Sequence, residues 1–145
     1  MRQFEIVPGA GVGPIKIGMT KAEVHGVFGL PEFESGNRFG YLGGFFIDFD
    51  DRGQVEFIEL AQSEIFAATY LGHDLHRIEA ESAIGFVAAH AALDNNHPEP
   101  GYSYIFPELQ MSLWRSVKPD DDSDLDGRHF EAIGIGCDEY FSSTK

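Results

Sequence analysis

The sequence predicts an α+β fold in which two similar halves, each one helix packed on an antiparallel β-meander, share a curved sheet. One observation behind this prediction is a helix with both ends marked, within residues 17–31. Another is a series of alternating apolar segments separated by glycine and acidic turns, which is typical of antiparallel strands. The helix-then-strands order also occurs twice. We therefore expect a single domain, 1–145, with halves at 1–66 and 67–145.

The composition indicates a folded, acidic protein. Of the 145 residues 43% are hydrophobic and 13 are phenylalanines, more than a disordered chain carries. The net charge is −14, and the 10 Lys and Arg residues never cluster, so we expect no binding to nucleic acid. An acidic surface suits high solubility, and it also suits a basic protein partner. Both alternatives stay open at this level.

The sequence also suggests a compartment. Cys137 is the single cysteine, so no internal disulfide can form, which fits a reducing environment. Residues 1–8 contain no long apolar run and no cleavage site, and no segment approaches the ~20 apolar residues of a membrane span. We expect a cytoplasmic protein without a signal peptide or membrane contact.

The first elements are a strand at residues 3–7 and a glycine-rich loop at residues 9–16. A loop rich in glycine can bind phosphate, which is the functional alternative to a simple turn for this segment. Against it, Pro14 follows the last glycine where a helix would have to begin, and no Gly-Lys-Ser/Thr follows. We interpret the segment as a turn that leads into the first helix.

The first helix is marked at both ends. Thr20 stands at the N-cap with Glu23 three residues on, which predicts a capping box. Gly29 can end the helix in a left-handed conformation, and Pro31 prevents it from resuming. Met19 and Val24 have the spacing of a hydrophobic staple. The predicted apolar face consists of Val24, Val27 and Phe28.

A module found in two protein families resembles this capped segment, which reads Ile17-Gly18-Met19-Thr20-x-x-Glu23-Val24 and closes with Gly29-x-Pro31. One family is the outer-membrane assembly lipoproteins of the SmpA/OmlA type. The other is the tandem-repeat β-lactamase inhibitory proteins, in which two helix-plus-sheet halves build a curved antiparallel sheet that grips an enzyme. This chain lacks the lipid-bearing cysteine of the former and the cysteine pairs of the latter, and its second half resembles uncharacterised actinobacterial proteins. The resemblance implies a binding module with one open sheet face, such as an immunity protein for a toxin.

The rest of the first half reads as a loop and a hairpin. Residues 32–38 are polar, which predicts a loop. Residues 41–49 alternate, and an acidic glycine turn at 50–53 separates them from a further strand at 55–60. In the strand at residues 41–49, the side chains expected on one face are Phe45, Ile47 and Phe49.

The second half repeats this order. A strand and turn at 69–75 precede a helix at 79–93, which a run of turn residues at 94–101 ends. Strands are predicted at 102–106, 109–115 and 130–135. The expected buried faces are Ile84, Val87, Ala88 and Ala91 on the helix, and Leu109, Met111 and Leu113 on the strand.

The closing strands of the two halves are alike. Residues 55–60 read VEFIEL and residues 130–135 read FEAIGI, each after its own helix and alternating strand. We interpret this likeness as a divergent duplication, and chance similarity of two short strands is the alternative. Neither half is large enough to bury much surface alone, so the two would share one core.

Candidate reactive groups are few. His73, Asp74, His76 and Glu79 lie close together in sequence and could suggest a metal site, but the helical His-Glu-x-x-His arrangement is absent and no cysteine joins them. Cys137 would need a histidine and an activating environment to act as a nucleophile, and a buried or incidental thiol is the commoner outcome. We therefore expect no catalytic residues, no metal and no cofactor, and we expect that the protein is not an enzyme.

The most charged stretch is a run of aspartates between two predicted strands. An EF-hand reading fails because the sixth position, counted from Asp120, is Leu125 and not glycine. A solvated loop is the plain interpretation, and an electrostatic contact for a basic partner is the other. The aspartates assigned to this candidate contact are Asp120, Asp121, Asp122, Asp124 and Asp126.

Three aromatic residues of the second half complete the candidate partner-binding site: Tyr102, Tyr104 and Trp114. Tyr and Trp on a partly exposed sheet face anchor interfaces, whereas packing in the core is the alternative. If Leu113 faces the helices, Trp114 faces the opposite side. The leading prediction is thus a non-enzymatic, acidic protein-binding module, such as an immunity or inhibitor protein. The alternatives are a small-molecule-binding or hydrolytic protein with a pocket between the halves at His73 and His76, and a scaffold that assembles with itself.

Overall fold

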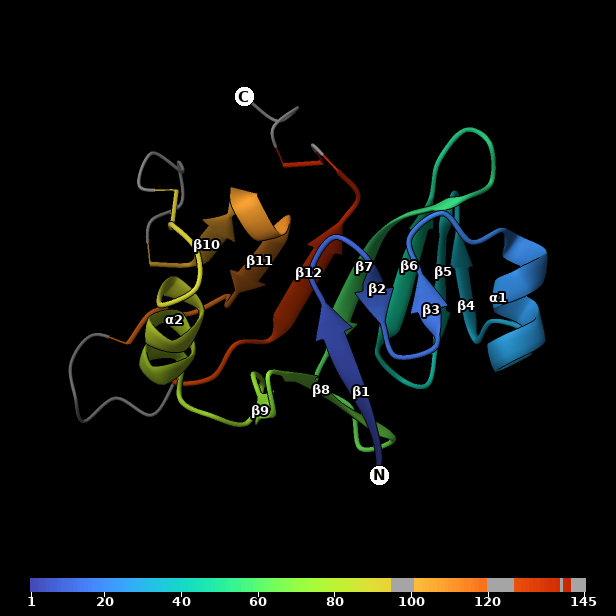
Figure 1. The fold of residues 1–145 in the computed structure, drawn as a ribbon. Helices are drawn as coiled ribbons and strands as arrows, with labels where there is room; N and C mark the ends of the chain where they lie inside the picture. Colours follow the sequence, from blue (N-terminus) through green and yellow to red (C-terminus); the bar gives the residue numbers. More distant parts are fainter. Residues whose placement is uncertain (95–100, 120–126, 139, 142–145) are drawn as a thin grey trace.

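The computed structural model describes residues 1–94, 101–119, 127–138 and 140–141, and it shows an α+β fold with two helices and two sheets (Figure 1). The helices are α1 (Lys21–Phe28) and α2 (Ala80–Ala88), and a 3₁₀ turn, η1, spans Pro107–Leu109. The strands of the first part of the chain are β1 (Arg2–Val7), β2 (Gly11–Val12), β3 (Ile15–Lys16), β4 (Phe33–Ser35), β5 (Arg38–Tyr41), β6 (Phe45–Phe49) and β7 (Val55–Ala61). Those of the second part are β8 (Phe66–Tyr70), β9 (His73–Asp74), β10 (Ser103–Phe106), β11 (Met111–Trp114) and β12 (Ala132–Gly136).

The larger sheet is antiparallel throughout, with the strand order β10-β11-β12-β7-β6-β5-β4. The smaller sheet has the order β3-β2-β1-β8-β9 and contains one parallel pair, in which Arg2 lies opposite Phe66 and Glu5 opposite Thr69. Parallel neighbours need a long connection, and all the elements from β2 to β7 lie between β1 and β8. The expected antiparallel meander is therefore confirmed for the larger sheet, while the smaller sheet adds a parallel pair that local patterns do not predict.

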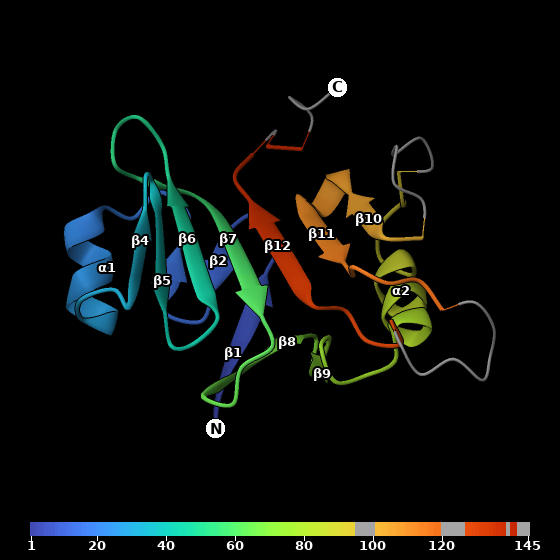
Figure 2. The same ribbon diagram turned by 180° about the vertical axis from the view of Figure 1, so that it is seen from behind.

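The core lies between one face of the larger sheet and the smaller sheet with its helices. Figures 1 and 2 show the smaller sheet on one side of the larger one, with α1 and α2 towards opposite ends. The predicted alternation in β6 is confirmed, since Phe45, Ile47 and Phe49 are at most 2% exposed. Their neighbours Ile58 and Leu60 in β7 are fully buried on the same face. We call this face of the larger sheet its inner face and the opposite one its outer face.

The capping box at the N-terminus of α1 is as predicted. The backbone N–H of Glu23 donates to the Thr20 hydroxyl at 3.2 Å, and the backbone N–H of Thr20 donates to the Glu23 carboxylate at 3.0 Å. Gly29 closes the helix, but with φ 81° and ψ −159° it lies outside the predicted left-handed helical region, in a positive-φ conformation that favours glycine. The predicted apolar face is only partly right, because Val24 is buried whereas Val27 is 44% exposed.

The second helix is shorter than predicted. It ends at Ala88 rather than at residue 93, and its buried face is Ala80, Ala83 and Val87, so Ala88 lies on the exposed side. Beyond Val87 the side chains of Ala88, Ala89 and His90 are exposed, so a longer helix would gain little burial there. The chain leaves the helix instead, and Leu93 packs against the core.

Two loop predictions also need correction. Residues 32–38 contain β4, whose three residues are all exposed. A strand at the margin of a sheet shows little apolar alternation, which explains why its sequence reads as a loop. The glycine-rich turn at residues 9–16 forms a small hairpin of β2 and β3.

The two similar segments lie side by side, because β7 pairs with β12. Leu60 lies opposite Ile133 and Ile58 opposite Ile135, so the apolar positions of both segments share the inner face. The strand β12 begins at Ala132, two residues later than predicted. The two-halves interpretation stays a prediction.

Two glycine substitutions test the packing of the larger sheet. A methyl group at Gly134 in β12 would lie 2.5 Å from the Ser112 hydroxyl and 2.6 Å from the Phe57 ring, whereas a methyl group at Gly26 in α1 meets nothing within 4 Å. We expect Gly134→Ala to lower the free energy of unfolding by about 1–3 kcal/mol. We expect the control Gly26→Ala to raise it by up to about 1 kcal/mol, since alanine favours helix interiors. Urea denaturation measures both, and a Gly134→Ala protein as stable as the parent would contradict the close packing.

Candidate protein-binding surface

The outer face of the larger sheet is turned away from the helices and the smaller sheet. Figure 2 looks onto this face, and none of the helices drawn lies in front of it. Strand pairing places Ser103, Trp114, Ala132 and Ala61 in one row across β10, β11, β12 and β7. We call this set the Trp114 row. Because the other three side chains are small, the indole of Trp114 stands clear of its neighbours and is 40% exposed.

An ion-pair network occupies the outer face further along the sheet. Arg38 of β5 donates to both oxygens of Asp48 in β6, at 2.7 and 2.9 Å, and to Glu59 of β7 at 3.1 Å. The guanidinium also lies 5.7 Å from the centre of the Phe46 ring. The two carboxylates outnumber the one guanidinium, so this network carries a net negative charge.

The chain after β12 covers one end of the outer face. The Tyr140 ring stacks on Phe57 with 4.6 Å between ring centres, and a methyl group at Gly136 would lie 2.6 Å from the Tyr140 Cβ. The backbone N–H of Phe141 donates to the Gln110 side chain at 2.8 Å, which holds this segment in place. The covered end is the one remote from the Trp114 row, because Gly136 and Ala132 are the two ends of β12.

The three aromatic residues predicted for partner binding have different surroundings. Trp114 faces outward, as the alternation predicts. Tyr104 faces the inner side, where its ring lies 5.6 Å from that of Phe130 and its hydroxyl accepts a hydrogen bond from Arg115. Tyr102 precedes β10 and is 40% exposed. The structure therefore brings Trp114 alone of the three onto the outer face within a strand.

The predicted acidic contact, Asp120, Asp121, Asp122, Asp124 and Asp126, lies outside the described residues.

Arg115 is a residue that the sequence reasoning passed over. It is 2% exposed, and its guanidinium donates to the carbonyl oxygens of Gly101 at 2.7 Å and Gly127 at 2.9 Å. The rings of Tyr104 and Phe130 lie 5.7 and 5.6 Å from it. Arg115 thus joins the chain before β10 to the chain before β12, next to Trp114. The strand alternation could have identified it: Met111 and Leu113 face the inner side, so Arg115, two residues further on, is expected to face that side as well.

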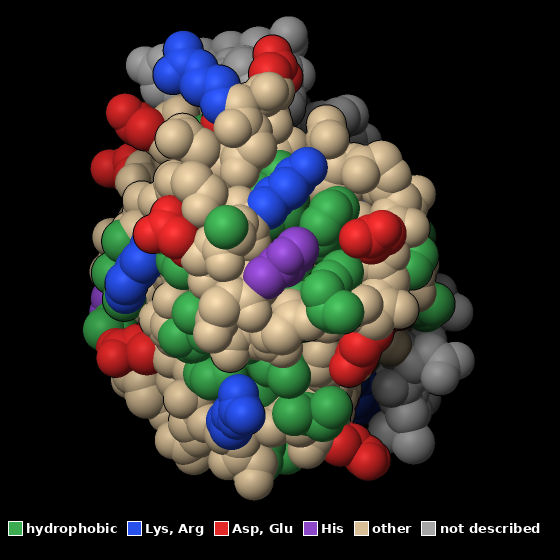
Figure 3. Space-filling model, turned by 90° about the vertical axis from the view of Figure 1, so that its right-hand side faces the viewer, with side chains coloured by type: hydrophobic (Ala, Val, Ile, Leu, Met, Phe, Trp, Pro, Cys, Tyr) green, Lys and Arg blue, Asp and Glu red, His purple; other side chains and the backbone are tan. Residues whose placement is uncertain are grey.

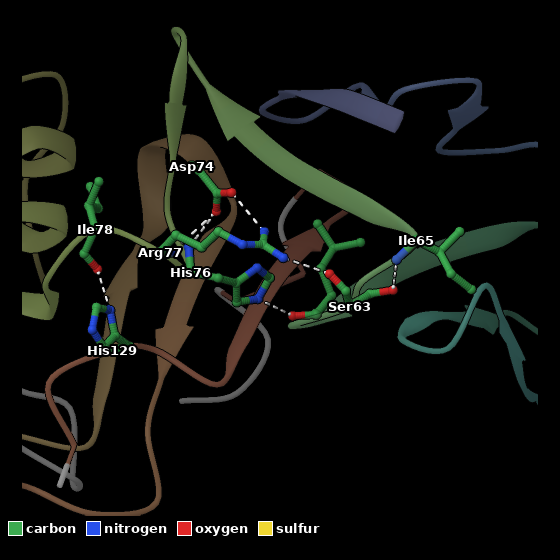
Figure 4. Close-up of polar contacts among 8 residues, drawn as sticks. Ser63, Ile65, Asp74, His76, Arg77, Ile78 and His129 are labelled. Atoms are coloured by element: carbon green, nitrogen blue, oxygen red, sulfur yellow. Dashed lines mark hydrogen bonds and ion pairs between the residues drawn. The ribbon is translucent and has the colours of Figure 1, made fainter. Parts of the chain in front are cut away.

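The histidine segment forms a structural network (Figure 4). His76 is 1% exposed, and its Nε2 donates to the carbonyl oxygen of Leu60 at 2.8 Å. The Asp74 carboxylate accepts from the backbone N–H groups of His76 and Arg77, and Arg77 continues to the carbonyl oxygen of Ser63 at 2.7 Å. These contacts tie the chain around β9 to the end of β7.

The second histidine of the predicted pocket has another environment. His73 is exposed, and its ring centre lies 4.1 Å from that of Phe86 in α2. Within the described ranges, no three His, Cys, Asp or Glu side chains gather closely enough to hold a metal ion.

Cys137 is in an unfavourable environment for nucleophilic chemistry. Burial raises the pKa of its thiol, and the negative charges of Glu56, Asp50 and Asp138 raise it further. Since the thiolate is the reactive form, this thiol is poorly activated at neutral pH.

Comparison with protein-family models, with curated proteins and with solved structures found no match. The resemblance to the inhibitory proteins and the lipoproteins therefore stays a prediction. Of the helices in the described part of the chain, neither has the length and apolar character needed to cross a bilayer.

The buried histidine predicts a pH dependence of stability. Burial is the main cause that lowers the pKa of His76 below its ordinary 6.5, so the folded state favours the neutral ring. As pH falls below 6.5 the unfolded chain binds a proton that the folded protein does not, and stability is lost, by at most about 1.4 kcal/mol per pH unit.

His76→Gln keeps an amide donor near Leu60 but cannot titrate. We expect the parent protein to lose more unfolding free energy than His76→Gln between pH 7.5 and pH 5.5, as measured by urea denaturation at each pH. Parallel curves for the two proteins would contradict the assignment.

Proposed function

We propose that this protein is a non-enzymatic module that binds a basic protein through the outer face of its larger sheet. The observation that carries the proposal is Trp114, which stands 40% exposed in a row of small side chains on a face that no drawn helix covers. A tryptophan gains much binding energy when a partner buries it, and it loses little conformational freedom in the process.

The charge of the protein indicates the kind of partner. The whole chain carries −14, and the outer face adds Asp48 and Glu59 around a single Arg38. A partner with exposed lysine and arginine residues would be attracted over a distance and correctly oriented before contact. A toxin inhibited by an immunity protein, or an enzyme gripped by an inhibitor protein, would fit this description.

The alternative, a small-molecule-binding or hydrolytic pocket at His73 and His76, has less support. The buried His76 already donates to the carbonyl oxygen of Leu60. His73 is exposed, and its ring packs against that of Phe86. The argument for a binding module rests on the sheet face and is independent of these residues.

Substitution of the tryptophan tests the proposal directly. The parent protein, immobilised and exposed to lysate of its source cell, should retain a basic protein that mass spectrometry identifies. With that protein purified, Trp114→Ala should weaken binding by at least about 2 kcal/mol, or roughly 30-fold in Kd, by calorimetry. The matched control is Leu71→Ala, which removes a 52% exposed apolar side chain at the turn between β8 and β9 of the smaller sheet. Equal losses for both variants would refute the assignment of the surface.

Salt should affect the same complex. Because attraction between exposed charges is screened at about 8 Å in physiological salt and more strongly above it, we expect the association rate to fall when NaCl is raised from about 0.05 to 0.5 M. Surface plasmon resonance separates this change from the dissociation rate. An association rate that does not depend on salt would remove charge from the description of the partner.

A further inference from the structure

A second group of polar side chains lies on the inner side of the sheet margin, next to α1. Glu34 of β4 pairs in register with Phe39 of β5, and Tyr41 lies two residues further along β5 on the same side. His25 of α1 stacks on the Phe39 ring, with 6.0 Å between ring centres and 15° between planes, and its ring centre is 6.4 Å from that of Tyr41. Figure 3 shows this side of the molecule, where hydrophobic side chains and a lysine or arginine side chain lie beside a histidine.

Two polar atoms of this group are buried without a hydrogen-bond partner among the described residues. They are the Tyr41 hydroxyl and the His25 Nε2. Tyr41 is only 2% exposed, so water does not reach its side chain freely. Buried polar atoms in folded proteins almost always have partners, because an unpaired one loses its hydration without compensation. This pair of atoms therefore points to a ligand group between α1 and β5.

The surroundings of the two atoms favour a positively charged ligand. Burial, and after it the negative charge of the Glu34 carboxylate, raises the pKa of Tyr41 to about 12. The aromatic rings beneath already accommodate an ammonium group, since the Lys21 Nζ lies 5.2 Å from the centre of the Phe39 ring and 5.5 Å from that of Phe49.

We propose that His25, Glu34 and Tyr41 form a binding site for a primary ammonium group. A primary ammonium has three donors and no acceptor. The site offers three acceptors: the imidazole Nε2, the phenolic oxygen and the carboxylate. The neighbouring ring faces add attraction for the positive charge. The group could belong to a small amine or to a lysine side chain, and the chemistry of recognition is the same for both.

The site is separate from the surface of the proposed function. Glu34 faces the inner side, whereas its neighbour Phe33 faces outward beside Phe46, with 6.0 Å between ring centres. Trp114 lies on β11, which is next to the opposite edge strand, β10, in the strand order of the larger sheet. Each proposal can therefore fail without the other.

NMR titration tests the ammonium site. We expect methylammonium chloride to shift the His25 imidazole signals in a saturable way, and sodium acetate to leave them unchanged. Tyr41→Phe and Glu34→Gln each remove one acceptor for the charged ligand, and each should weaken methylammonium binding at least about 10-fold. The control Tyr70→Phe, which removes the hydroxyl of another buried tyrosine, should bind as the parent does. Trp114→Ala should also bind as the parent does, which separates this test from that of the proposed function.

Two further arms complete the test. A capped peptide with one lysine shows whether a lysine side chain enters the site, and the same peptide with norleucine in place of the lysine is its control. If methylammonium binds and the lysine peptide does not, the site is one for small amines. Lys21→Gln should strengthen methylammonium binding by removing a neighbouring positive charge.

The proposal is overturned if neither ammonium compound shifts the His25 signals. It is also overturned if acetate binds instead, or if the Tyr41→Phe protein, shown to be folded by its thermal melting curve, binds methylammonium as tightly as the parent.

Discussion

The pairing of β7 with β12 is the contact on which the larger sheet depends. It joins a strand of the first part of the chain to the last strand described, in register from Phe57 and Gly136 to Ala61 and Ala132. Its inner positions are fully buried, and its outer positions are alanine, glycine, Phe57 and Glu59. A shift of one residue in this register would turn the charged side chain of Glu59 towards the core, so the burial of the inner face strongly specifies the pairing.

This central pair also explains why the side chains next to Trp114 on the outer face are small. Ala132 and Gly134 on β12 raise no large side chain beside β11, while Phe57 leans across Gly134 from β7. The consequence is an uneven face. One end is already packed by Phe57 and Tyr140, and the other end presents a single large indole above small neighbours.

Much of this arrangement follows from local sequence patterns. The hairpin of β6 and β7, the capping of α1 by Thr20 and Glu23, and the outward direction of Trp114 all depend on residues that are close together in the chain. At such short range the helical period and the strand alternation decide which way a side chain points. The α+β class was predictable for the same reason.

The features that could not be predicted depend on residues far apart in the chain. The parallel pair of β1 and β8, the hydrogen bond from His76 to Leu60 and the contacts of Arg115 with Gly101 and Gly127 form only once distant strands have met. The strand β4 was missed because its residues are exposed and carry no apolar alternation. The candidate surface was thus foreseen in its central residue, Trp114, while the cluster at His25 and Tyr41 was not foreseen at all.

Trp114 is the only tryptophan in the sequence, and its ring is 40% exposed. Indole emission shifts to shorter wavelengths when water leaves the ring. The protein therefore carries a natural optical reporter on its outer face: a molecule seated over β11 would change the colour of the fluorescence, and a ligand held under α1 would leave it as it is.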